Sequence, residues 1–249
     1  MASKATRNKQ LLSDSAKSKL KIVVPLVLVV LLAAGVAVGV FNVGRVEKQH
    51  VVGNTKASTE AVLEAAAVKR GSPLFTATSS AINKRVVAKQ PWVSKAEVIK
   101  RWPSTLEFHV TERVPVAQLV TDDKRWALVS NDGVVLEVVA KQAPAFPLVM
   151  DETVAPTPGA KANDRAMKLI SMVDHLPDSL RPKVVQLQLR GDSDGYLGLN
   201  SGPIVELGPI DQELGSKLTA AAAVLGKEDN AKIKSLDVRT PRMPLAQPK

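Results

Sequence analysis

Two neighbouring stretches near the middle of the chain alternate apolar and polar side chains with a period of two. The first is WVSKAEVIKR at 92–101 and the second is TLEFHVTER at 105–113, with the turn sequence Trp102-Pro103-Ser104 between them. Their polar face includes His109 and Arg113, and their apolar face consists of the even-numbered residues Trp92, Ala96, Val98, Leu106, Phe108 and Val110. Two half-apolar strands joined by a short turn predict an antiparallel hairpin that covers a core.

A spacing of three to four residues, typical of helices, dominates the stretch before this hairpin. TEAVLEAAAVK at 59–69 predicts a helix that Ser58 or Thr59 caps, and Gly71-Ser72-Pro73 interrupts it. A second helix is expected from near Thr78 to about Lys89, and a short strand over 45–52 precedes both helices. The predicted order of elements is therefore β-α-α-β-β.

The second half of the chain predicts a larger, antiparallel β-rich domain with two helices, so that the fold class is α+β. A hairpin is expected around Asn131-Asp132-Gly133, a loop over 151–162, and a three-stranded meander over 184–207. One helix should run from Asn163 or Asp164 to Leu176, and a second should begin at Asp211. A last strand is expected over about 232–239.

Three prolines at 241, 244 and 248 follow that last strand, and we expect them to prevent further sheet pairing. The strand should then be the edge of the sheet, where unpaired backbone groups invite a partner strand and charged side chains guard against the wrong one. The sequence thus predicts a partner-binding edge made of Lys232, Lys234, Ser235, Leu236, Asp237, Val238 and Arg239.

An uncharged, apolar run from Ile22 to Gly44 precedes all of these elements. It is long enough to cross a hydrocarbon core of ~30 Å as a helix. Residues 1–21 hold six Lys or Arg and one Asp, so the positive-inside rule places the N-terminus in the cytoplasm and the rest of the chain outside. A cleaved signal peptide is the alternative, with Ala37-Val38-Gly39 as its cleavage site, but its apolar region should span only ~7–15 residues.

Composition and motifs argue against catalysis. The chain has no cysteine, and its three histidines, His50, His109 and His175, are far apart in the sequence. It has no phosphate-binding glycine loop and no G-x-S-x-G, and its one S-x-x-K, at Ser18, precedes the membrane segment. We therefore expect a protein that is not an enzyme, with no cofactor, no metal and no small-molecule substrate. Its basic cluster is explained by membrane orientation, so no nucleic-acid partner is expected.

One string of residues resembles a known family. It combines Arg101-Trp102-Pro103-Ser104-Thr105-Leu106 with Thr111-Glu112-Arg113-Val114-Pro115-Val116-Ala117, after Gly53-Asn54, Leu74-Phe75 and Pro91-Trp92-Val93. With the β-α-α-β-β order, this looks like a POTRA domain and, more closely, like the bacterial cell-division family FtsQ/DivIB. The family's turn before the next strand appears here as Ser130-Asn131-Asp132-Gly133.

The resemblance implies a layout of a basic cytoplasmic tail (1–21), a transmembrane helix (22–43), a POTRA domain (44–114), an FtsQ-like β domain (115–240) and a Pro-rich tail (241–249). It implies a scaffold at the division septum whose partners are FtsB-like and FtsL-like bitopic coiled coils, together with septal peptidoglycan synthases. In that family the end of the β domain is where the FtsB-like partner docks. The alternative function is a membrane-anchored cell-wall-binding or hydrolase-accessory protein.

Overall fold

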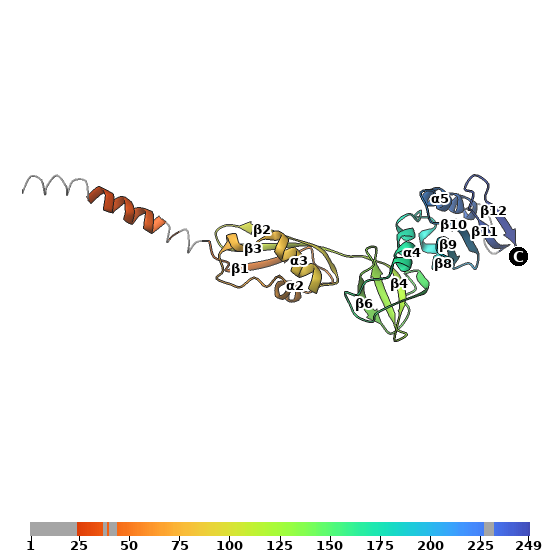
Figure 1. The fold of residues 1–249 in the computed structure, drawn as a ribbon, viewed down its shortest axis with the longest axis horizontal. Helices are drawn as coiled ribbons and strands as arrows, with labels where there is room; N and C mark the ends of the chain where they lie inside the picture. The colour runs from red at the N-terminus through yellow and green to blue at the C-terminus, as the bar shows by residue number, and fades with distance from the viewer. Residues whose placement is uncertain (1–23, 37–38, 40–43, 227–231) are drawn as a thin grey trace, which may run out of the picture.

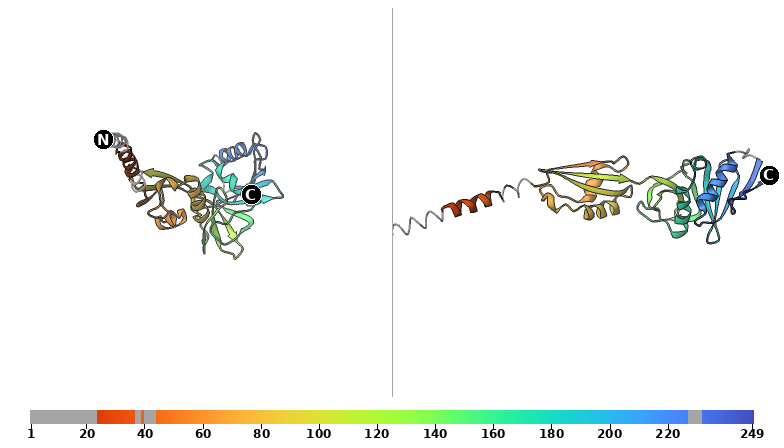
Figure 2. Two further views of the ribbon diagram at one scale, coloured as in Figure 1. Left: turned by 60° about the vertical axis from the view of Figure 1, so that its left-hand side comes forward. Right: turned by 90° about the horizontal axis from the view of Figure 1, so that it is seen from above.

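A computed structural model describes residues 24–36, 39, 44–226 and 232–249 of the chain. Two sheet-containing domains follow one another, and the C-terminus lies at the far side of the second domain from the first (Figure 1, Figure 2). Residues 24–36 are helical, and their side chains are exposed; the rest of the predicted 22–43 segment and the 1–21 tail lie wholly or largely outside the described residues. Within the part of the chain that the structure describes, no helix is both long enough and apolar enough to cross a membrane.

The first domain is a three-stranded sheet covered by two helices. Its strands are β1 (Lys48–Val52), β2 (Val93–Arg101) and β3 (Thr105–Glu112), in the spatial order β1-β3-β2, with β1 parallel and β2 antiparallel to β3. The connection from β1 to β2 holds α2 (Thr59–Ala66), a 3-10 turn η1 (Leu74–Thr76) and α3 (Ser79–Lys89). Both helices and the hairpin agree with the expectation from the sequence.

The local reasons for these elements are visible in the caps and the core. The Ser58 side chain accepts a hydrogen bond from the Ala61 amide and so begins α2, while Ala67, at a φ of 51°, ends it. Leu106 and Phe108 of β3 are fully buried, whereas His109, which points to the opposite face of the sheet, is partly exposed. A bulge in β2 between Val93 and Lys95 turns Val93 inward, which simple alternation does not anticipate.

The second domain is built on one nine-stranded sheet with the order β12-β11-β10-β9-β8-β7-β4-β5-β6. The strands are β4 (Pro115–Thr121), β5 (Trp126–Ser130), β6 (Val135–Val139), β7 (Leu148–Val154), β8 (Val184–Arg190), β9 (Asp194–Leu199), β10 (Ile204–Pro209), β11 (Ile233–Asp237) and β12 (Leu245–Pro248). The helices are α4 (Asp164–Asp174) and α5 (Leu214–Leu225), with a 3-10 turn η2 (Arg181–Lys183). The predicted β5–β6 hairpin and the β8–β9–β10 meander are both present.

Three predictions about this domain were wrong. The sheet is mixed rather than antiparallel, because β7 pairs in parallel with both β4 and β8, and β10 pairs in parallel with β11. Residues 151–154, expected in a loop, form the second half of β7. Asp211 does not cap α5 directly: it lies two residues before Glu213, the N-cap position, and its carboxylate accepts from the Glu213 amide and from the Lys217 ammonium within α5.

Each domain has its own apolar core. The first core contains Val62, Ile82, Val86 and Phe108 among others, and the second is centred on α4, α5 and the inner face of the large sheet. Aliphatic side chains fill both, as the low aromatic content requires. The two clusters are separate, so the apolar cores do not merge across the boundary between the domains.

Candidate functional site

The predicted edge strand is in fact an inner strand. β11 pairs in parallel with β10 on one side, through Val205–Leu236, and antiparallel with β12 on the other, through Leu236–Ala246. The prediction that Pro241, Pro244 and Pro248 prevent pairing was therefore wrong. Pro248 ends the outermost strand, a position where a missing N–H is tolerated, and the other two prolines precede that strand.

The seven residues predicted for partner binding divide into two sets in the structure. Leu236 and Val238 are fully buried core residues, and Ser235 donates a hydrogen bond to Gln247 of β12, so the side chains of these three residues face neighbours within the domain. Lys232, Lys234 and Arg239 are exposed, and Asp237 is partly exposed. The structure therefore leaves the charged members on the surface and pairs Asp237 with Arg239, but it does not place them on the free edge itself.

The free edge belongs to β12. The Lys249 amide donates to the Lys232 carbonyl, at 3.0 Å, so odd-numbered amides of β12 face β11. Successive amides in a strand point to opposite sides, so the Ala246 N–H faces away from the sheet. Met243 just before this edge and Leu245 at its start have 78% and 60% of their surface exposed. The edge offers one outward N–H, that of Ala246, because the neighbouring outward positions 244 and 248 are proline, and it combines this donor with exposed apolar side chains that an added strand can cover.

An open groove borders this region on the side of α5. Its volume is about 550 Å³, and it is lined by Pro241 and Arg242 of the β11–β12 connection and by the small residues Gly215, Ser216, Thr219, Ala220 and Ala223 of α5. Glu213 also lines the groove, so the lining combines small residues with one acidic and one basic side chain.

Arg239 is held in place by Asp237. The guanidinium donates to both carboxylate oxygens, with the shortest distance 2.6 Å, and the hydrogen bond from Arg239 lowers the pKa of Asp237 while the pKa of Arg239 is raised. The stem of Arg239 also lies against Gly208, where an added Cβ would approach its Cγ at 2.8 Å. This arrangement fixes one exposed cation beside the C-terminal strands.

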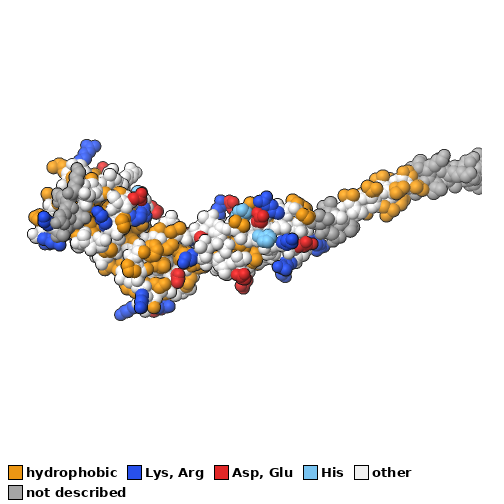
Figure 3. Space-filling model, turned by 180° about the vertical axis from the view of Figure 1, so that it is seen from behind, with side chains coloured by type: hydrophobic (Ala, Val, Ile, Leu, Met, Phe, Trp, Pro, Cys, Tyr) orange, Lys and Arg blue, Asp and Glu red, His pale blue; other side chains and the backbone are white. Residues whose placement is uncertain are grey.

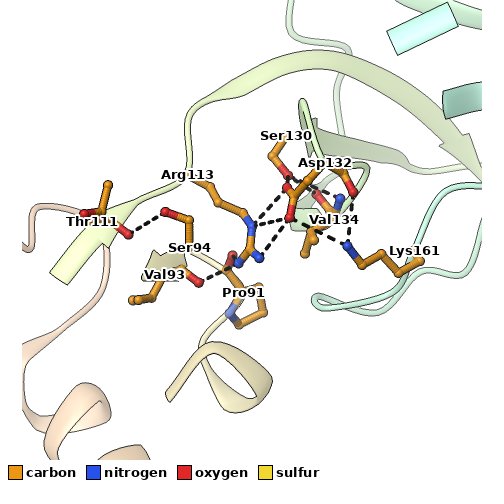
Figure 4. Close-up of polar contacts among 9 residues, drawn as sticks. All are labelled: Pro91, Val93, Ser94, Thr111, Arg113, Ser130, Asp132, Val134 and Lys161. Carbon is orange, nitrogen blue, oxygen red and sulfur yellow. Dashed lines mark hydrogen bonds and ion pairs between the residues drawn. The ribbon is translucent and has the colours of Figure 1, made fainter. Parts of the chain in front are cut away.

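A second candidate site lies between the domains, and the sequence pattern did not reveal it. Arg113, expected on an exposed polar face, has only 8% of its side chain exposed. It donates to the carbonyls of Pro91 and Val93 in the first domain, at 2.9 and 2.6 Å, and to both carboxylate oxygens of Asp132 in the second (Figure 4). The alternation correctly assigned Arg113 to the polar face, but periodicity carries no information about a neighbouring domain that covers that face.

Asp132 is the centre of the network on the other side of the joint. It accepts from the Ser130 hydroxyl at 2.6 Å, and Lys161 lies 3.6 Å from its carboxylate (Figure 4). Burial by itself raises the pKa of Asp132, but the hydrogen bonds from Arg113 and Ser130 and the charges of Arg113 and Lys161 lower it overall. The joint is thus formed by a carboxylate that stays ionised at neutral pH.

Glu112, next to Arg113 in the sequence, has a different task. Its carboxylate accepts the amides of Thr55, Lys56 and Ala57, at 2.8–3.0 Å, and so holds the chain that leads into α2. The Glu-Arg pair of the family-like string therefore anchors an internal loop with one residue and the neighbouring domain with the next. That string was the one sequence feature from which the importance of Arg113 could have been inferred, and that inference was not drawn from the sequence.

No catalytic arrangement is seen in the described part of the chain. His109 contacts Glu107 at 3.2 Å and is partly exposed, and His175 contacts the Ser171 carbonyl. Among the described residues, no group of three or more His, Asp or Glu side chains is placed to hold a metal ion.

Comparison with known proteins gives matches over most of the chain. A family model described as "POTRA domain, FtsQ-type" matches residues 44–113, and one described as "Cell division protein FtsQ/DivIB, C-terminal" matches residues 117–239. The chain belongs to the FtsQ/DivIB family of cell division proteins. Both domains of the fold, the POTRA domain and the β domain, are thereby accounted for.

Two relatives from Streptomyces agree with this assignment. The cell division protein FtsQ of Streptomyces coelicolor is 26% identical over 231 residues, which cover 89% of this chain and 87% of that protein. The FtsQ of Streptomyces collinus is 32% identical over 130 residues, or 51% of this chain and 49% of the relative. The major extracytoplasmic domain of DivIB from Geobacillus stearothermophilus, a solved structure, aligns with a TM-score of 0.34 at 16% identity, covering 47% of this chain and 99% of that chain.

Proposed function

We propose that this chain is a non-catalytic scaffold of the bacterial division machinery, anchored in the cell membrane and placed at the division septum. A single helix at 22–43 crosses the membrane, the 1–21 tail is cytoplasmic, and the POTRA domain (44–114) and β domain lie outside. Membership of a cell-division family supports the role in division. The uncharged 22–44 run after a basic tail supports the anchor, and the described helical part, 24–36, exposes its apolar side chains as a membrane helix does.

The scaffold binds its partner by strand addition to β12. The observation that carries this proposal is the position of β12 as the outermost strand of the nine-stranded sheet, with the Ala246 amide facing outward. Main-chain bonds to this edge give affinity, and the exposed Lys234 of the adjoining strand favours an acidic partner segment, whereas Arg239 is already paired with Asp237 and lies against Gly208 of β10. Residues 241–249, which include β12, belong to the docking site in this proposal, and 115–240 supplies the rest of the sheet.

The partners expected at this edge are FtsB-like and FtsL-like bitopic coiled-coil proteins, with septal peptidoglycan synthases joining the same assembly. The alternative, a cell-wall-binding or hydrolase-accessory protein, makes a different prediction for depletion. Filamentous cells with unfinished septa support the scaffold, whereas normal division with altered wall binding contradicts it.

A pair of proline variants tests the docking edge. Ala246→Pro removes the outward amide and leaves the bonds between β11 and β12 intact, so the domain should stay folded while partner capture falls at least about tenfold. Affinity capture of the tagged full-length chain from solubilised membranes measures this, with FtsB-like and FtsL-like proteins detected by mass spectrometry.

The matched control is Gln247→Pro, one residue along the same strand. Its amide faces β11, so this variant should lower the melting temperature of the β domain. Full capture by the folded Ala246→Pro chain would show that the partner does not pair with β12.

A further inference from the structure

The end of the POTRA domain at which the chain enters combines exposed aromatic and basic side chains. Two hydrogen bonds place the entering chain at this end. The Gly44 carbonyl accepts from the Leu74 amide at 2.7 Å, and the Glu47 amide donates to the Ser104 carbonyl in the β2–β3 turn. Three segments therefore meet at this end, namely 44–48, 68–76 and 99–104. We call their exposed aromatic and basic residues the proximal surface: Phe75, Trp102, Arg45, Lys48, Lys69, Arg70, Lys100 and Arg101.

Phe75 and Trp102 are unusual in their exposure. Phe75 has 65% of its surface exposed and Trp102 has 63%, although the chain has only eight aromatic residues. Both lie on short connections with defined structure. Phe75 is in η1, and its carbonyl accepts a hydrogen bond from Lys100; Trp102 is in the β2–β3 turn. Neither aromatic contributes to the core of the domain, so their position calls for another contact.

Charge is concentrated at the same end. The three segments that meet there hold six basic residues and one acidic residue, Glu47; one of the six, Arg101, is paired with Glu107 of β3 at 3.1 Å. The rest of the POTRA domain, 49–67, 77–98 and 105–113, holds six basic and five acidic residues, which is close to balance. Basic and apolar side chains are both visible at this end of the domain in Figure 3.

We propose that the proximal surface docks on the outer face of the lipid bilayer, with Phe75 and Trp102 in the headgroup region and the cations on anionic lipid phosphates. Aromatic side chains favour the membrane–water interface, and basic side chains favour a surface of anionic lipid. Continuity selects this occupant over a protein, because the surface surrounds the point where the chain arrives from its apolar segment. The inference rests on the proposed membrane anchor, and it adds that the POTRA domain is held against the membrane rather than tethered loosely above it.

The absence of cysteine makes a direct test possible. Thr76→Cys, exposed beside Phe75, carries a fluorophore, and Thr111→Cys, exposed at the opposite end of β3, carries it as the control. The labelled full-length chain is reconstituted in vesicles of phosphatidylcholine alone or of an equal mixture with phosphatidylglycerol, each containing lipid with a nitroxide just below the headgroup. We expect quenching at position 76, stronger in the anionic mixture, and little quenching at position 111.

Two variants separate docking from mere closeness to the anchor. Trp102→Ser should reduce quenching at position 76 in both lipids. Lys69→Gln with Lys100→Gln should remove the preference for the anionic mixture, since each cation near such a surface contributes roughly fivefold in binding. Lys84→Gln with Lys89→Gln removes two exposed cations of α3 and should leave the signal unchanged.

The outcomes distinguish this inference from the proposed function. Flotation of the vesicles after an alkaline wash reports whether the chain is anchored at all. A chain that is washed off overturns both the anchor and the docking. A chain that stays with the vesicles but shows the same quenching in every variant, or equal quenching at positions 76 and 111, overturns the docking alone.

Discussion

At the scale of single residues, the β3 strand tests whether alternation was assigned to the correct faces. Phe108 is fully buried, while the side chain of His109, its neighbour in sequence, is 40% exposed. Phe108→Ala should cost about 3–5 kcal/mol of unfolding free energy because a large cavity remains. His109→Ala should cost less than about 0.5 kcal/mol. Urea unfolding of the 44–249 fragment measures both losses, and losses of similar size would mean that the faces are reversed.

Arg113 is the residue on which the arrangement of the two domains depends. Arg113→Ala leaves the Pro91 and Val93 carbonyls and the Asp132 carboxylate without their donor, which should cost about 1–3 kcal/mol. The domains should then sample a wider range of orientations. Spin labels on Ser80→Cys and Lys141→Cys, one exposed site per domain, measure this as a broader distance distribution.

The matched control for Arg113 is Arg125→Ala. Arg125 also binds an aspartate, Asp123, but both lie within the β domain, and the hydrogen bond from Arg125 is the main cause that lowers the pKa of Asp123 to about 2. Removing Arg125 should therefore raise the pKa of Asp123 and leave the interdomain distances unchanged. Equal broadening in both variants would argue against a specific role of Arg113.

The same joint should respond to acid with a definite sign. The pKa of Asp132 is lower in the folded protein than the ordinary value of about 3.9, so ionised Asp132 contributes stability at neutral pH and above that value. The contribution is lost as the pH falls through the lowered pKa. The spin-label distances should stay narrow from pH 7 to about pH 4 and broaden below it, and Asp132→Asn should lack this step.

At the scale of elements, local sequence signals were sufficient to predict a helix or hairpin where the segment has one buried face and defined ends. The helix at Asp164–Asp174 begins at Asn163, whose side chain accepts from the Ala166 amide, and these features were readable from the sequence. The β5–β6 hairpin at Asn131-Asp132-Gly133 was equally clear, and Gly133 adopts a φ of 71° as that turn requires.

Elements that depend on distant neighbours were the ones missed. β12 has only four residues and ends in proline, so nothing local favours a strand; its pairing with β11 creates it. The second half of β7, from Asp151 to Val154, likewise begins with a residue, Asp151, whose φ is 62°, and it becomes a strand because β4 lies beside it. Because β12 was not predicted, the free edge of the sheet was assigned from the sequence to β11 instead of β12. The error arose because proline was expected to exclude a strand, although proline is excluded only from central strands and is tolerated in an outer one.

At the scale of the whole molecule, the proposed function gives the two ends separate tasks. The chain enters the POTRA domain beside Leu74, and Arg113 connects the opposite end of that domain to the β domain, whose C-terminal strand lies farther still (Figure 1). A rigid joint at Arg113 would therefore set the position of β12 relative to the membrane. In the proposed function, the distance of β12 from the membrane therefore depends both on the anchor and on the orientation of the joint.

The topology itself gives the last prediction. Residues 1–21 hold six basic residues and one acid, and only Arg45 and Lys48 follow closely after the 22–44 run, so the N-terminus should stay in the cytoplasm. A reporter enzyme that is active only outside the cytoplasm should be active when fused after Lys249 and silent when placed before Leu11. The reverse pattern would refute the orientation. N-terminal sequencing of the mature protein should recover the basic tail, because a chain that begins near Val40 would instead have lost a signal peptide at Ala37-Val38-Gly39.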